Sequence, residues 1–180
     1  MNAGARQARG LLLCFHHADS GLGVEHVAAL VDIAKNEQII GGAFHRKFDN
    51  QNAWMRRWEM LLRSISLPMG VPLFGDQSVF VKAAVFRQLG GFADIPLMED
   101  VDFSRRLRRS GRLALLDPPV WSSPRRFRRL GNLSTSLVNA LMILFFYLGV
   151  SPHTLHRWYY RERFGPRKPQ HNRENQSPRV

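Results

Sequence analysis

The chain has 180 residues, of which 44% are hydrophobic; this is enough for one compact domain and excludes a wholly disordered protein. Its 26 basic residues outnumber its 14 acidic ones and give a formal net charge of +12, so it should attract nucleic acid, anionic lipid head groups or the diphosphate of a nucleotide-linked substrate. The single cysteine, Cys14, excludes an internal disulfide and a cysteine-based metal cluster, and its apolar surroundings predict a buried, inert thiol.

Apolar periodicity predicts strands and helices that alternate along the first two thirds of the chain. In chain order these are a strand at 11–15, a helix at 24–36, a strand at 39–48, a helix at 53–66, a strand at 79–81, a helix at 83–89, a helix at 98–110 and a proline-interrupted edge strand at 113–121. The first strand should be buried and end in a polar loop, which is where ligands bind in open α/β sheets. The order of elements indicates an α/β fold.

The C-terminal third begins with an uncharged segment, residues 133–150, which is at the short end of the roughly 17–25 residues that span a bilayer. It is compatible with a membrane-docking helix pair in the plane of the surface, with a single transmembrane helix, or with an amphipathic helix that covers the core. Trp158, Tyr159 and Tyr160 lie beside arginines and suit a lipid–water interface. Three regions are therefore expected: 1–130, the helical 131–163, and a disordered tail at 164–180.

Five short motifs resemble those of one enzyme family. They are Met-Asn-Ala-Gly-Ala at 1–5, Phe-His-His-Ala-Asp-Ser at 15–20, Phe-Gly-Asp-Gln at 74–77, Leu-Gly-Gly-Phe at 89–92 and Pro-Leu-Met-Glu-Asp at 96–100. Up to about Arg163 the chain is similar to the family-two glycosyltransferases, especially the radical-SAM/selenodomain-associated subfamily. The resemblance implies a partial GT-A fold with a mixed sheet and C-terminal helices. It also implies inverting transfer of a sugar from a nucleotide-sugar donor to a lipid or other hydroxyl acceptor.

The resemblance assigns the chemistry to two acidic positions. Asp19 would bind the divalent metal, Mg²⁺ or Mn²⁺, together with His17, which stands where the family usually has an aspartate and is a poorer ligand for magnesium. Asp100 would be the general base, supported by Glu99, a role that contributes roughly 10²–10⁴ in rate. Two carboxylates at the start of a helix also suit the positive end of the helix dipole, so a purely structural role is the alternative.

Further positions are implied to contact the substrates. These substrate-binding candidates are Asn2, Gly4, Asp76, Gln77, Arg125, Arg126 and Arg129. A plain turn explains Asp76 and Gln77 nearly as well, and the arginines would either grip the donor diphosphate or form a membrane-facing patch.

Two signatures of the family, Pro-Asn-Glu and Asp-Gly-Gly-Ser, do not occur in the sequence. The chain is therefore expected to start at the third or fourth strand region of the family, with low solubility and no transferase activity on its own. We expect it in the cytoplasm, peripheral to the cytoplasmic membrane. The alternative functions are a membrane-associated non-catalytic subunit and a basic nucleic-acid-binding protein, although no specific nucleic-acid motif is recognised.

Overall fold

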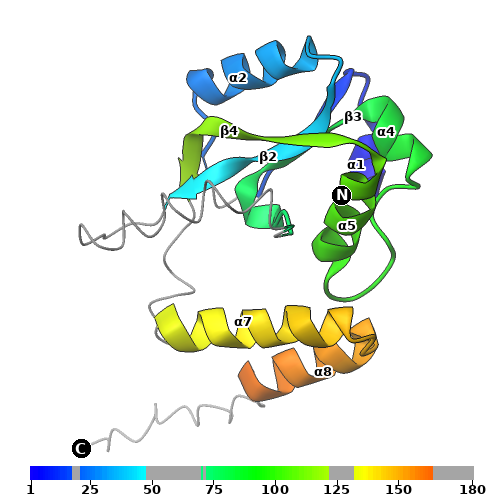
Figure 1. Ribbon diagram of the computed structural model, residues 1–180, viewed down its shortest axis with the longest axis vertical. Helices are drawn as coiled ribbons and strands as arrows, with labels where there is room; N and C mark the ends of the chain where they lie inside the picture. The colour runs from blue at the N-terminus through cyan, green and yellow to red at the C-terminus, as the bar shows by residue number, and fades with distance from the viewer. Residues whose placement is uncertain (18–20, 48–69, 71, 122–131, 164–180) are drawn as a thin grey trace, which may run out of the picture.

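The computed structural model describes residues 1–17, 21–47, 70, 72–121 and 132–163, in which four strands form one mixed sheet (Figure 1). The strand order is β1 (Leu12–Phe15), β3 (Val79–Lys82), β2 (Ile39–Lys47) and β4 (Arg112–Trp121). Strand β3 runs antiparallel to both of its neighbours, whereas β2 and β4 are parallel. The α/β class with a mixed sheet is thus confirmed, and β4 lies at an edge of the described sheet as predicted.

One face of the sheet carries the larger hydrophobic core. Helices α4 (Ala83–Gln88) and α5 (Glu99–Ser110) contribute Phe86, Phe103 and Leu107 to it. From the sheet, Val79 and Val81 point to the same side because side chains alternate along a strand. Phe103 and Leu107 are one helical turn apart, so a single face of α5 is buried and its polar face is left for other contacts.

The opposite face is covered by α2 (Val24–Ala34), which is anchored by the buried His26. The His26 ring packs edge-on against Phe44, with 5.2 Å between ring centroids. Its Nδ1 accepts a hydrogen bond from the Gly23 N–H at 3.0 Å, so Nε2 carries the proton and faces the Pro119 carbonyl at 3.4 Å. This histidine therefore ties the start of α2 to β4.

Helices α7 (Asn132–Tyr147) and α8 (Pro152–Arg163) form a hairpin beside the start of α5 (Figure 1). Met142 and Leu155 from the hairpin are buried with Met98 and Val101 in a second hydrophobic cluster. The uncharged segment therefore ends in a turn rather than continuing as one long helix, and Gly149 in this turn has a φ of 88°. Among the described helices, none has the length and apolarity needed to cross a bilayer. The predicted helix at 53–66 and the tail at 164–180 lie outside the described residues.

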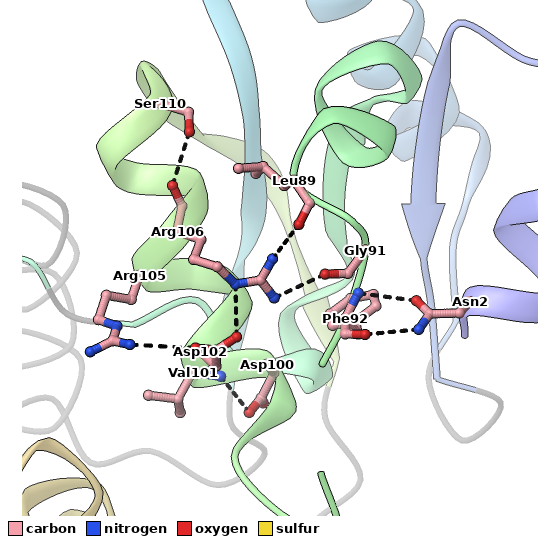
Figure 2. Close-up of polar contacts among 10 residues, drawn as sticks. All are labelled: Asn2, Leu89, Gly91, Phe92, Asp100, Val101, Asp102, Arg105, Arg106 and Ser110. Carbon is pink, nitrogen blue, oxygen red and sulfur yellow. Dashed lines mark hydrogen bonds and ion pairs between the residues drawn. The ribbon is translucent and has the colours of Figure 1, made fainter. Parts of the chain in front are cut away.

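A short helix that periodicity did not predict, α1 (Asn2–Gln7), packs against the turn at 89–92. The Asn2 amide donates to the Phe92 carbonyl at 2.8 Å and accepts from the Phe92 N–H at 3.0 Å (Figure 2). From the other side, Arg106 donates to the carbonyls of Leu89 and Gly91 at 2.7 and 2.9 Å. The turn thus fixes α1 beside the start of α5.

Candidate active site

Asp100 lies in the first turn of α5, which begins after a left-handed residue, Met98, with a φ of 69°. Its Oδ1 accepts a hydrogen bond from the Val101 N–H at 2.8 Å (Figure 2). Its Oδ2 accepts one from the Gly75 N–H at 3.0 Å. Gly75 opens the 3₁₀ turn η1 (Gly75–Gln77), so this carboxylate joins the start of α5 to η1.

The surroundings of Asp100 raise the pKa of its carboxyl above the ordinary value of 3.8. The largest cause is burial, which penalises the charged form, and the nearby charge of Asp76 acts in the same direction. The backbone hydrogen bonds from Gly75 and Val101 oppose this effect without cancelling it. A carboxylate with a raised pKa is a stronger proton acceptor, which is the property required of a general base.

Asp100 and Glu99 face a small cavity of about 40 Å³, enough for a few small polar atoms. A larger groove of about 400 Å³ runs between α1 and β1, and its volume is within the range of ligand pockets. The two spaces share a wall, since Met1, Phe15, His17 and Gly75 line both. The carboxylates therefore lie at one end of a ligand-sized groove.

His17 reaches this junction from the C-terminal end of β1, where the sequence predicted a binding loop. A Cβ atom on Gly75 would lie 2.8 Å from His17 Nε2 and 3.8 Å from Asp100 Oδ2. The imidazole and the carboxylate thus approach one point from two distant parts of the chain. Asp19, the other predicted metal ligand, lies outside the described residues.

The polar groups of Asp76 and Gln77 hold η1 against β2. Asp76 Oδ2 pairs with Arg46 Nη1 at 2.6 Å, and both side chains are partly buried. Gln77 Oε1 accepts from the Phe74 N–H at 3.0 Å, while Nε2 lies 3.5 Å from the Phe44 carbonyl. Contacts of Asp76 and Gln77 with a substrate therefore stay a prediction.

Arg46 was not singled out from the sequence, because its partner can be seen only in the structure. It follows the buried segment 41–44 within β2, and a cation at the end of a buried strand requires an opposite charge. The structure shows that Asp76 supplies that charge. Because Asp76 in turn acts on Asp100, Arg46 belongs to the electrostatics of the site.

The remaining predicted substrate-binding residues do not gather at one place in the structure. Gly4 lines the larger groove, whereas both ends of the Asn2 amide are bonded to Phe92. Arg125, Arg126 and Arg129 fall outside the described residues. Their proposed roles stay predictions.

Cys14 lines the same groove but is a poor nucleophile. Burial raises the pKa of its thiol to about 11, so the reactive thiolate is scarce at neutral pH. The side chain is only half-buried, so it is less enclosed than the sequence predicted, but the expected lack of reactivity has a clear physical cause.

The described residues do not fit a metal site on their own. Among them, no three histidine, cysteine or acidic side chains come together to hold an ion. His17 is in place, but a single imidazole is a poor anchor for Mg²⁺ or Mn²⁺, which prefer oxygen ligands. We therefore assign no chemical step to a metal.

No family model, curated protein or solved structure matches this chain. The glycosyltransferase resemblance thus depends on the five sequence motifs. The structure itself establishes a mixed α/β fold in which each of the five motifs contributes at least one residue to the lining of the small cavity: Met1, His17, Gly75, Phe92 and Asp100.

Proposed function

We propose that this chain is a GT-A-like unit of an inverting glycosyltransferase, which transfers a sugar from a nucleotide-sugar donor to a hydroxyl acceptor. The observation that carries the proposal is Asp100, a carboxylate with a raised pKa that faces the cavity beside His17. A purely structural acid at a helix start would be expected to have a lowered pKa, because the helix dipole stabilises its charged form.

In this proposal, Asp100 accepts the proton of the acceptor hydroxyl as the oxygen attacks the anomeric carbon of the sugar. The bond from that carbon to the diphosphate breaks, the diphosphate leaves with the electron pair, and the configuration at the carbon inverts. Each Asp100 oxygen receives one described backbone hydrogen bond, and a carboxylate can accept about four in total. The two bonds therefore orient the group while acceptor capacity remains for the hydroxyl.

Glu99 lines the same cavity as Asp100 and would support the base there. The groove between α1 and β1 would hold the donor, with Gly4 allowing close approach. The divalent ion implied by the resemblance would bind at Asp19 and His17.

The experiment is to incubate the full chain with UDP-glucose or GDP-mannose and MnCl₂ or MgCl₂, and to measure nucleoside diphosphate release. The sequence alone predicts no activity for this chain, whereas the ligand-sized groove that adjoins the Asp100 cavity favours slow release, and calorimetry of donor binding accompanies the assay. Asp100→Asn should lower release by roughly 10²–10⁴, or to background. Asp94→Asn, which makes the same change at an exposed carboxylate, is the matched control and should leave release unchanged.

Equal release by the chain and its Asp100→Asn variant would refute the assigned base. Absence of both release and donor binding, with every donor and metal tested, would refute the transferase proposal itself.

A further inference from the structure

The α7–α8 hairpin exposes a row of leucines that no described part of the chain covers. Leu141, Leu144 and Leu148, here called the leucine stripe, are 40%, 51% and 70% exposed. Their spacing of three and four residues places them on one side of α7 and its C-terminal turn. On the other side of α7, Met142 is buried against Met98 and Val101. The hairpin is therefore apolar on both sides, and only one side faces the protein core.

An aromatic residue of α8 packs against α7, and an exposed arginine precedes it in the chain. Trp158 of α8 is 43% exposed and packs edge-on against Phe145 of α7, with ring centroids 5.9 Å apart. Arg157, next to it, is exposed. Leucines beside a tryptophan and an arginine are typical of a helix that lies in the membrane interface, where the ring sits at head-group depth and the cation meets lipid phosphate.

We propose that the leucine stripe and Trp158 form a surface that docks in the plane of an anionic phospholipid bilayer. Charge complementarity favours lipid over a second copy of the chain, because a net charge of +12 attracts an anionic surface and makes two copies repel each other. The patch also has far fewer members than the roughly 20–30 residues that each partner gives to a standard protein interface. This surface does not depend on the proposed transferase activity.

The test is co-sedimentation of the full chain with vesicles of phosphatidylcholine alone and of phosphatidylcholine mixed equally with phosphatidylglycerol. Binding should be strong to the mixed vesicles and weak to the neutral ones. The double variant Leu144→Glu/Leu148→Glu should partition at least tenfold less, which corresponds to about 1.4 kcal/mol.

The matched control is Val27→Glu/Val31→Glu on α2. These valines are 52% and 53% exposed, have the same four-residue spacing and give the same change in charge. Partitioning of this control should stay within twofold of the unaltered chain, because α2 has no part in the proposed surface.

A second measurement covers the case in which the leucine variant loses its fold. Brominated phospholipids should quench tryptophan fluorescence of the unaltered chain on binding, and Trp158→Phe should remove most of that quenching. The proposal is overturned if the leucine and valine variants lose vesicle binding equally, or if quenching persists in Trp158→Phe. It is also overturned if the chain does not bind vesicles and instead forms a dimer that Leu144→Glu/Leu148→Glu dissociates.

Discussion

Gly75 and Asp100 meet at the centre of the site: the N–H of Gly75 donates to Asp100 Oδ2 at 3.0 Å, and the missing side chain of Gly75 leaves room for His17. Gly75, 25 positions away in the chain, thus fixes the Asp100 carboxylate. His17, from the end of β1, occupies the space beside Gly75. The addition of a single methyl group at position 75 is therefore expected to disturb the site.

We predict that Gly75→Ala displaces His17, because the new Cβ would lie 2.8 Å from Nε2, closer than van der Waals contact allows. The His17 side chain is exposed and can rotate away, so the free energy of unfolding should fall by about 1 kcal/mol or less. Nucleoside diphosphate release should fall by roughly 10- to 100-fold, since small misplacements in a site are costly.

The control for this change is Gly21→Ala, where the structure places no described atom within 4 Å of the new Cβ. It should behave like the unaltered chain in both assays. Unchanged release by Gly75→Ala would show that His17 has no part in the reaction.

Arg106 joins α5 to the turn at 89–92 by two hydrogen bonds to carbonyls of that turn (Figure 2). A third bond, from Nε to Asp102 at 2.8 Å, holds the guanidinium in place. Arg106→Lys keeps the charge but loses the planar fork, so at least one carbonyl loses its donor. We expect urea unfolding to show a loss of about 1–3 kcal/mol. Arg105→Lys changes an exposed neighbour and should cost less than about 0.5 kcal/mol. Equal losses of stability in Arg106→Lys and Arg105→Lys would mean that the hydrogen bonds of Arg106 to the turn do not stabilise the fold.

The Arg46–Asp76 pair should stabilise both the fold and the charge balance of the site. Arg46→Gln removes the partner of a partly buried carboxylate, and we expect the free energy of unfolding to fall by about 1.5 kcal/mol. Lys35→Gln removes an ion pair with Asp32 that is largely exposed and should cost about 0.5 kcal/mol or less. Chemical denaturation of both variants at neutral pH makes the comparison. A smaller loss for Arg46→Gln than for Lys35→Gln would contradict the structural account.

Local patterns predicted most of the described elements, because they depend on periodicity and on strong breakers. Strands β1, β2 and β3 and helices α2, α4 and α5 lie within a few residues of their predicted limits. Strand β4 was predicted as an edge strand interrupted by its prolines, and it ends at Trp121 as expected. Its pairing with β2 shifts register between Leu116 and Val120, where Pro118 and Pro119 lie.

Long-range contacts explain what the sequence could not show. Helix α1 has six residues and no apolar repeat, and it depends on the bonds between Asn2 and Phe92, 90 positions apart. The burial of β1 was overestimated, since only Leu13 of its four residues is fully buried and the strand lies at an edge of the described sheet. Arg46 was missed because its pairing with Asp76 exists only once β2 and η1 meet.

The raised pKa of Asp100 makes stability depend on pH in a defined direction. The folded chain binds this proton more tightly than the unfolded chain does, so the contribution of Asp100 to stability is fully present below pH 3.8 and is lost as pH rises through the raised pKa. The free energy of unfolding of the unaltered chain minus that of Asp100→Asn should therefore fall as the pH rises across that window. A difference that rises over the same window would mean that the pKa is lowered.

A direct measurement is an NMR titration of the Asp100 carboxyl carbon, in a chain labelled with ¹³C-aspartate and assigned by comparison with Asp100→Asn. The account predicts a midpoint clearly above 3.8, as expected for a desolvated proton acceptor facing the cavity. A midpoint at or below 3.8 would identify Asp100 as an ordinary helix-start carboxylate and would contradict its role as the base.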